Sequence, residues 1–353
     1  MNSFTYTGLP ARVVFGVGTT AALPDEVGAL GIKKALVLTT THQKAEGEAL
    51  AEILGNASAG VFSEAAMHTP VEVTERAMAA FKTAGADGIV SIGGGSTIGL
   101  GKAIALRNDA PQVVLPTSYA GSEMTPIIGQ TEAGKKTTQR TLKVLPETVI
   151  YDVNFTLTLP PKMTVTSGMN AIAHAVEALY AQEANPVLSL MAEDGIAKMT
   201  SALARVQEAP ADIDARSDAL YGAWLCAVCL GSGGVALHHK LCHVLGGSFD
   251  LPHAETHTVI LPHALAYNAP AIPRAMEALR RATESDKPAA ALFQIAQSAG
   301  VPTSLEELGM PQDGIARAVD ITLENPYFNP RALERDALVT LLENAWHGHE
   351  PAT

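Results

Sequence analysis

The chain has 353 residues, of which 47% are hydrophobic and 17% are charged, and this composition excludes a disordered chain and a coiled coil. The formal net charge is −12, and no stretch is rich in Lys and Arg, so we expect no nucleic-acid partner. The longest apolar runs fall well short of the ~20 residues of a membrane span, so we expect no membrane partner. A chain of this length is expected to form about two domains.

Residues 1–159 are predicted to alternate strands with helices. The expected strands are Lys34–Thr39, Ala59–Phe62, Gly88–Ile92, Val113–Leu115 and Thr148–Tyr151, and the expected helices are Gln43–Leu54, Val71–Ala84 and Thr97–Leu106. Strands that are apolar on both faces belong in a parallel sheet covered by helices. We therefore predict an α/β dinucleotide-binding domain. Ahead of it, Phe4–Tyr6 and Arg12–Phe15 flank Gly8-Leu9-Pro10 and predict an N-terminal hairpin.

Residues 160–353 are predicted to form an all-α domain, because strand signals end at Leu159-Pro160-Pro161. The expected long helices are Met163–Ala181, Pro186–Val206, Ala215–Leu230 and Val235–Leu245, followed by shorter helices broken at Pro262, Pro270, Pro302 and Pro330. Cys226 and Cys229 lie in an apolar helix without a second pair, so we expect them to be buried small side chains. The start of the chain lacks the pattern of a signal peptide, and three cysteines cannot all pair, so we expect a reducing cytoplasm.

A glycine-rich turn, Gly93-Gly94-Gly95-Ser96, follows the strand Gly88–Ile92 and opens the next helix. Glycine lets the backbone approach a phosphate closely, and the free N–H groups of a helix start suit a pyrophosphate. Ser96 is expected to cap the helix. An ordinary βα turn would have the same composition, and the sequence does not fit the G-x-G-x-x-G fingerprint. A second polar turn, Pro116–Glu123, follows the strand Val113–Leu115, so the two turns together predict a nucleotide cradle.

Histidines are concentrated in the helical half, where six of the 11 lie between His238 and His263. His239 and His243 are four residues apart and share a helix face, as Asn170 and His174 do earlier in the chain. His253 follows an expected helix break at Gly246-Gly247, so the chain could fold back towards the same place. A single histidine on an apolar face is usually a core residue, but a cluster of six predicts a functional site that binds a metal, moves protons or holds an anion.

The order of these motifs resembles the iron-containing alcohol dehydrogenase family along essentially the whole chain. The strings that carry the resemblance are GGGS, PTSYAGSEMTPI, LPETVIYD, SGMNAIAHAVEALYA, GGVALHHKLCHVLGGSFDLPHAETHTVILPHALAYNAPA and ENPYFNPR. The resemblance implies the dehydroquinate synthase-like fold that the family shares, an NADH or NADPH cofactor, and a homodimer.

The resemblance also implies the site residues. Family members that use a metal bind it with one Asp and three His, and the matching positions here are Asn170, His174, His239 and His253. Because a neutral amide is a poorer ligand than a carboxylate, we expect no metal. His243 matches a further active-site histidine. The matching cofactor contacts are Gly93, Gly94, Gly95, Ser96, Thr117 and Ser118, with Ser122 and Lys136 as weaker matches.

Thr40 follows the first expected strand, where family members that prefer NAD often carry an Asp, so NADPH is not excluded. Within the family, the strings are most similar to enzymes that reduce a small dicarboxylate whose ketone is conjugated to a C=C bond. The expected chemistry is hydride addition to that bond, with His243 and His253 supplying proton donation and enolate stabilisation. The alternatives are a metal-dependent alcohol or glycerol dehydrogenase, a lyase of the dehydroquinate synthase kind, and a non-catalytic nucleotide-binding module.

Overall fold

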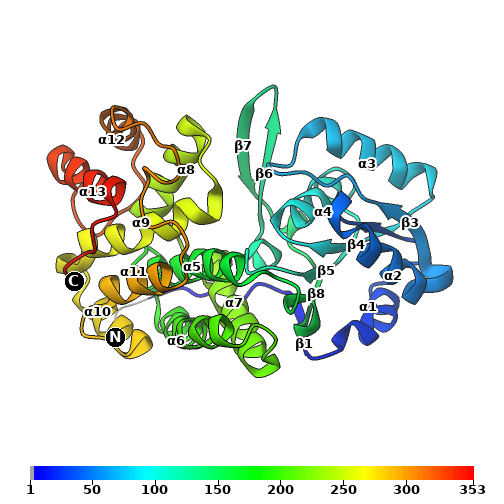
Figure 1. Ribbon diagram of the computed structural model, residues 1–353. Helices are drawn as coiled ribbons and strands as arrows, with labels where there is room; N and C mark the ends of the chain where they lie inside the picture. The colour runs from blue at the N-terminus through cyan, green and yellow to red at the C-terminus, as the bar shows by residue number, and fades with distance from the viewer. Residues whose placement is uncertain (1–3) are drawn as a thin grey trace. The chain divides into compact units, whose positions relative to one another are not determined.

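The computed structural model describes residues 4–353, except for the side chain of Lys136. The chain divides into two compact units: Gly8–Leu159 form the first, and Pro160–Thr353 form the second together with residues 4–7. Figure 1 shows strands and helices in the first unit and helices in the second. The fold is the α/β plus all-α combination that the sequence predicts.

A six-stranded, fully parallel sheet forms the centre of the first unit, in the strand order β1-β8-β5-β4-β2-β3. The strands are β1 (Arg12–Gly16), β2 (Ala35–Leu38), β3 (Ser58–Phe62), β4 (Gly88–Gly93), β5 (Gln112–Pro116) and β8 (Thr148–Asp152). The predicted N-terminal hairpin is wrong. Residues 4–11 form no strand, and β1 pairs in parallel with β8 at the edge of the sheet, where Arg12 lies beside Thr148.

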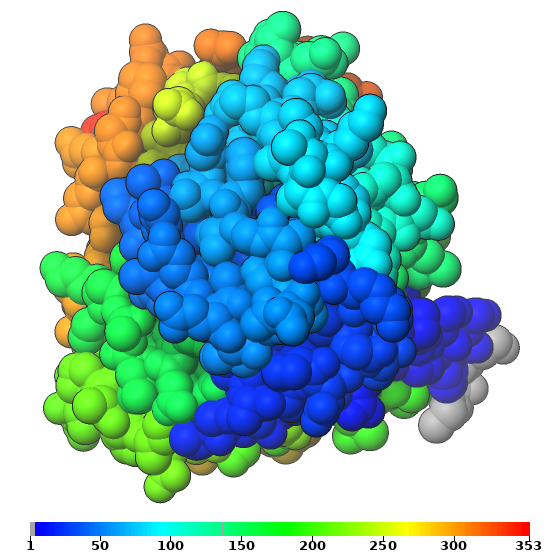
Figure 2. Space-filling view, turned by 90° about the vertical axis from the view of Figure 1, so that its right-hand side faces the viewer, coloured from blue at the N-terminus to red at the C-terminus, as the bar shows by residue number. Residues whose placement is uncertain are grey.

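Helices cover both faces of the sheet, as expected for strands that are apolar on both sides. Leu23 of α1 (Leu23–Ala29) and Leu50 of α2 (Lys44–Leu54) pack on one face against Val90. On the other face, α3 (Val71–Thr83) and α4 (Gly95–Asn108) pack Phe81 and Leu100 against strand residues such as Ile89. Helices α1 to α3, in blue to cyan, make up much of the surface in Figure 2.

A two-stranded antiparallel hairpin, β6 (Ile127–Glu132) and β7 (Lys135–Arg140), follows β5 and was not predicted. Its turn residues Ala133 and Gly134 both have positive φ, 48° and 77°, the conformation that two-residue hairpin turns require.

The second unit is entirely helical among the residues described. Its helices are α5 (Pro161–Ala178), α6 (Pro186–Glu208), α7 (Ile213–Ser232), α8 (Leu237–Phe249), α9 (His253–Asn268), α10 (Pro273–Thr283), α11 (Pro288–Ser298), α12 (Gly314–Glu324) and α13 (Arg335–His347). Helices α6 and α7 approach closely at Gly222, where an added Cβ would lie 2.9 Å from the carbonyl oxygen of Gly195. Cys226 and Cys229 are buried on α7, as predicted.

Two predicted helix breaks are wrong. Helix α8 continues through Gly246-Gly247 and ends at Phe249, where Asp250 adopts the left-handed conformation with φ 53°. Helix α9 continues through Pro262 to Asn268. Among residues 4–353, no single helix is long and apolar enough to cross a membrane. Helices α7 and α8 pass that test only as a pair that is bent by 91°.

Candidate active site

The glycine-rich turn and the second polar turn lie side by side in the first unit, because β4 and β5 are neighbouring strands. The backbone N–H of Thr117 donates to the carbonyl oxygen of Gly93 at 3.1 Å. An added Cβ at Gly94 would lie 2.9 Å from Oγ of Ser118, whereas Gly95 is exposed and would meet only Ala120, at 3.8 Å. The two turns therefore meet at the carboxyl end of the sheet, where α/β proteins bind their ligands.

Helix α4 begins without a side-chain cap. Its N-cap is Gly94, which has no side chain, and Ser96 lies inside the first turn, so the expected capping by Ser96 is wrong. The N–H group of Thr97 donates to the carbonyl oxygen of Gly94 at 3.1 Å, and those of Gly95 and Ser96 are available to an anion. Among the other residues expected at this site, Thr40 lies two residues beyond β2 and is the N-cap of the short helix Thr41–Gln43, and Ser122 opens the short helix Ser122–Met124. Lys136 is on β7, but its side chain lies outside the described residues.

A buried lysine holds the second turn in place. Lys102 is fully buried on α4, and its ammonium donates to the carbonyl oxygens of Ser122, Thr125 and Ile127 and to the hydroxyl of Thr125. Burial lowers the pKa of Lys102 to about 7, but four oxygen acceptors are best satisfied by the charged form, which carries three N–H donors. In the same turn, the buried carboxyl group of Glu123 accepts from the hydroxyl of Tyr151 at 2.8 Å. Burial raises the pKa of Glu123.

The histidine cluster is built by three helices of the second unit. His174 comes from α5, His239 and His243 from α8, and His253 and His257 from the start of α9. The rings of His174 and His239 stack with centroids 5.1 Å apart. The ring of His257 lies 5.0 Å from that of His239 and 4.3 Å from that of His253. The fold therefore brings together the histidines that the sequence places at the site.

Several polar atoms of this cluster are buried and have no hydrogen-bond partner among the described residues. They include Nδ1 of His174 and the Nε2 atoms of His239 and His257, and Oδ1 of Asn170, one turn before His174 on α5, is buried without a partner in the same way. By contrast, His243 and His253 are exposed to solvent. Buried polar atoms without partners are rare in folded proteins and often mark a ligand site.

The sequence did not single out Glu177, which positions this cluster. Its fully buried carboxyl group accepts from Nδ1 of His239 at 2.7 Å and from the backbone N–H groups of Ala236 and His238 at 2.6 and 2.7 Å. Glu177 on α5 thereby caps the start of α8 and orients the ring of His239, directing its Nε2 atom away from the carboxyl group. The signal was present in the sequence, because Glu177 follows His174 by three residues and so shares its helix face.

Burial keeps most of the inner rings uncharged. Burial and the neighbouring imidazoles lower the pKa values of His174, His238 and His257 well below the usual histidine range. Charging one ring raises the cost of charging the next, because like charges repel at these separations. His174, His238 and His257 are therefore neutral imidazole groups at pH 7.

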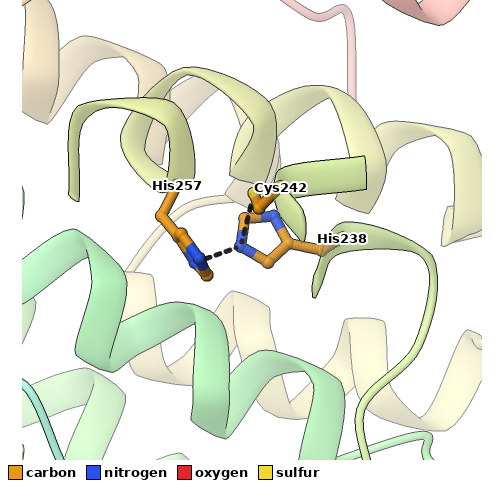
Figure 3. A group of neighbouring side chains, drawn as sticks. All are labelled: His238, Cys242 and His257. Carbon is orange, nitrogen blue, oxygen red and sulfur yellow. Dashed lines mark hydrogen bonds between the residues drawn. The ribbon is translucent and has the colours of Figure 1, made fainter. Parts of the chain in front are cut away.

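His238, His257 and Cys242 form a second group of side chains beside the cluster. Nε2 of His238 is 3.0 Å from Nδ1 of His257 and 3.7 Å from Sγ of Cys242, and Figure 3 shows the ring of His238 in contact with both. All three are buried, with ligand atoms within 4.8 Å of one another, so they could hold one metal ion. Metal-bound histidines normally donate their other ring N–H to an acceptor, but Nδ1 of His238 and Nε2 of His257 have no partner among the described residues. The geometry is better explained by a hydrogen-bonded pair of imidazoles.

The residues at the four positions implied by the resemblance do not fit a divalent iron site. They offer the amide of Asn170 and three imidazoles, with no anionic ligand to offset the charge of the ion. Glu177 brings a carboxyl group to the cluster, but it accepts three hydrogen bonds and faces Nδ1 of His239, leaving Nε2 on the other side of the ring.

A tyrosine outside the predicted site also reaches the cluster. The hydroxyl of Tyr327 lies 3.1 Å from Nδ1 of His243. Tyr327 belongs to the irregular segment between α12 and α13, 84 residues along the chain from His243, and within the string ENPYFNPR.

Comparisons with known proteins agree along the whole chain. Residues 10–153 match the iron-containing alcohol dehydrogenase model, and residues 164–346 match the model of the C-terminal part of that family. The chain is 53% identical over 351 residues to a maleylacetate reductase of Rhizobium sp. strain MTP-10005, covering 99% of this chain and 100% of the relative. It is 54% identical over 352 residues to a maleylacetate reductase of Burkholderia cepacia, covering 100% of both. A solved structure of maleylacetate reductase from Agrobacterium tumefaciens superposes with a TM-score of 0.97 at 54% identity, covering 99% of this chain and 100% of that one.

Proposed function

The chain belongs to the iron-containing alcohol dehydrogenase family, and from this premise we propose that it reduces maleylacetate to 3-oxoadipate with NADH or NADPH. The observation that carries the proposal is the identity of 53–54% along the full length to two maleylacetate reductases. The presence of Asn170 at the position of the family's metal-binding Asp supports it, because the proposed reaction does not need a metal to polarise a carbonyl group.

The reaction adds two hydrogens across a conjugated C=C bond. Bound NADH or NADPH supplies the hydride, which is added to the alkene carbon β to the ketone. The electron pair of the C=C bond then moves towards the ketone oxygen, forming an enolate. A proton delivered to the carbon beside the ketone completes 3-oxoadipate. The protein must therefore stabilise a negative oxygen and donate one proton.

His239 is suited to stabilise the enolate oxygen. Its Nδ1 atom faces the Glu177 carboxyl group, and its Nε2 atom has no partner among the described residues. The Glu177 carboxyl group holds the ring at Nδ1, which leaves Nε2 as the atom that can face an oxyanion. We assign the neighbouring His253 to the same oxygen.

His243 is suited to donate the proton. It is exposed, unlike His174 and His239, and its Nδ1 atom contacts the hydroxyl of Tyr327. Because solvent reaches both side chains, a proton lost from His243 can be replaced from water. Asn170 and His174 are both buried, and we assign them to binding the substrate.

The cofactor is assigned to the two turns of the first unit. Gly93, Gly94, Gly95 and Ser96 would hold the pyrophosphate at the start of α4, and Thr117, Ser118 and Ser122 would bind from the second turn. Because Thr40 stands just beyond β2 in place of an Asp, no carboxylate there would repel the 2′-phosphate of NADPH. This supports the use of both NADH and NADPH. Lys136 is retained as a further candidate contact.

We also propose that the enzyme works without a bound metal and assembles as a homodimer. The missing anionic ligand supports the first statement, and the family relationship supports the second. Light scattering on a size-exclusion column tests the dimer.

The test is a spectrophotometric assay at 340 nm with maleylacetate and each cofactor in turn, with and without a chelator. The proposal predicts oxidation of the cofactor that the chelator does not reduce. Turnover of simple alcohols or glycerol that stops on chelation would instead support the metal-dependent dehydrogenase.

A further inference from the structure

Lys240 is a buried cation without a hydrogen-bond acceptor. It lies on α8 between His239 and His243 and is only 9% exposed. Among residues 4–353, no oxygen or carboxylate pairs with its ammonium group; the contact it makes is with the ring of Tyr327, 5.5 Å from Nζ to the centroid. A buried ammonium group normally pairs with an anion or with several acceptors, because losing its hydration is costly.

Lys102 shows what a structural buried lysine looks like in the same chain. Its Nζ atom is surrounded by four oxygen acceptors from one turn. Glu177, whose carboxyl group contacts the histidine cluster, accepts its three hydrogen bonds from other donors and none from Lys240. Within the part of the chain that the structure describes, Lys240 therefore lacks the anionic or hydrogen-bonding partner that a buried lysine normally has.

The surroundings of Lys240 are held firmly but remain open on one side. The segment that carries Tyr327 is fixed by Asn329, whose amide exchanges two hydrogen bonds with Asn268 at 2.8 and 3.0 Å, and by Arg331, which donates to the carbonyl oxygen of Tyr267. Arg331 also stacks 4.2 Å from the ring of Tyr267, so its guanidinium group is already occupied. Tyr327 itself is 37% exposed, which leaves access from solvent.

We propose that the ammonium group of Lys240 binds one carboxylate of the substrate, beside the ring of Tyr327 and next to the proton donor His243. The inference rests on the proposed function and deepens it, because a dianionic substrate must find cations on a chain with a net charge of −12. A charge-assisted hydrogen bond from an ammonium group also fixes the orientation of the bound molecule. Lys240 is thus a specificity-determining residue for dicarboxylates.

The test compares Lys240→Met, Lys240→Arg and the matched control Lys198→Met, which removes an exposed lysine paired with Asp218 on the surface. For Lys240→Met we expect the KM for maleylacetate to rise at least tenfold, a change of ~1.4 kcal/mol, while the dissociation constant of NADH and the melting temperature stay close to wild type. Lys240→Arg should recover part of the affinity, and Lys198→Met should change nothing. An unchanged KM in a folded Lys240→Met enzyme overturns the proposal.

A second readout does not depend on turnover. Adipate is an unreactive dicarboxylate of similar length, and its binding is measured by calorimetry in wild type and in Lys240→Met. We expect wild type to bind it at least tenfold more tightly. Equal affinities, or no binding to wild type, overturn the anion site. A wild-type enzyme that binds adipate through Lys240 but does not reduce maleylacetate would instead refute the proposed function alone.

Discussion

Replacing Glu177 by Gln tests whether one buried carboxyl group organises the histidine cluster. Glu177 accepts three hydrogen bonds, from the backbone of Ala236 and His238 and from the ring of His239. A glutamine keeps the shape but has one oxygen, so its NH₂ group must face at least one of these donors. Hydrogen bonds to charged groups contribute ~1.5–3 kcal/mol each. We therefore expect a loss of about 2–3 kcal/mol in the free energy of unfolding.

The matched control is Glu193→Gln on α6. Glu193 accepts two hydrogen bonds from Arg281, but that arginine is 62% exposed, and surface ion pairs contribute up to ~1 kcal/mol. In thermal melts, Glu177→Gln should lower the melting temperature by roughly 5–10 °C, whereas Glu193→Gln should lower it by less than about 4 °C.

The same substitution should lower kcat. An amide in place of the carboxylate weakens the hydrogen bond that orients the ring of His239, and loss of such an orienting partner typically costs ~10–100-fold in activity. The kinetics are measured below the melting temperature of the variant, on folded enzyme. A Glu177→Gln enzyme with wild-type stability and wild-type kcat would refute the role assigned to this carboxyl group.

Four further substitutions or titrations give separate tests. His243→Ala should lower kcat by roughly 10²-fold with little change in melting temperature, since it removes an exposed proton donor; an unchanged kcat across pH 6–8 rules that role out. Gly95→Val should raise the dissociation constant of NADH at least ~10-fold in a fluorescence titration. The added Cβ meets only Ala120, at 3.8 Å, so we expect the variant to fold. Unchanged binding of NADH by the folded variant argues against the cofactor assignment. Asn170→Asp should bind Zn²⁺ or Fe²⁺ more tightly than wild type in a calorimetric titration, as it restores an anionic ligand beside three imidazoles; equal affinity would contradict the explanation of the metal-free site. Burial lowers the pKa of His263 to about 4, so between pH ~6.5 and ~4 the unfolded chain binds more protons than the folded one. The free energy of unfolding should therefore fall on acidification by up to about 3 kcal/mol from this group. A His263→Leu variant that loses stability just as steeply would show that other groups account for the slope.

Local patterns were sufficient to predict most of the sheet. The strands β2, β4 and β5 are apolar on both faces because helices cover both sides, and that requirement is visible in short stretches such as Gly88–Ile92. The hairpin β6–β7 was missed because its strands, TEAGKKTT around the turn, are polar and carry no apolar alternation. The N-terminal hairpin was predicted from two short segments on either side of turn residues, but β1 instead pairs with a strand 136 residues later in the chain, Arg12 with Thr148.

The site was predictable where its residues share a helix and unpredictable where they do not. The spacing of four residues between Asn170 and His174, and between His239 and His243, follows from helix geometry. Tyr327 could not be placed from spacing, since it lies in an irregular segment, which Asn329 and Arg331 attach to α9. Likewise, the burial of Lys240 without an acceptor is a property of three-dimensional packing and leaves no trace in the sequence.

The central claim is that hydride is added to the C=C bond of maleylacetate without the help of a metal. The most direct measurement is NMR of the product formed by chelator-treated enzyme from maleylacetate and NADH carrying deuterium at the transferred position. The account predicts 3-oxoadipate with deuterium on the methylene carbon β to the ketone. Deuterium on a carbinol carbon, which would mean that the ketone itself was reduced, or loss of all turnover after chelation, would contradict it.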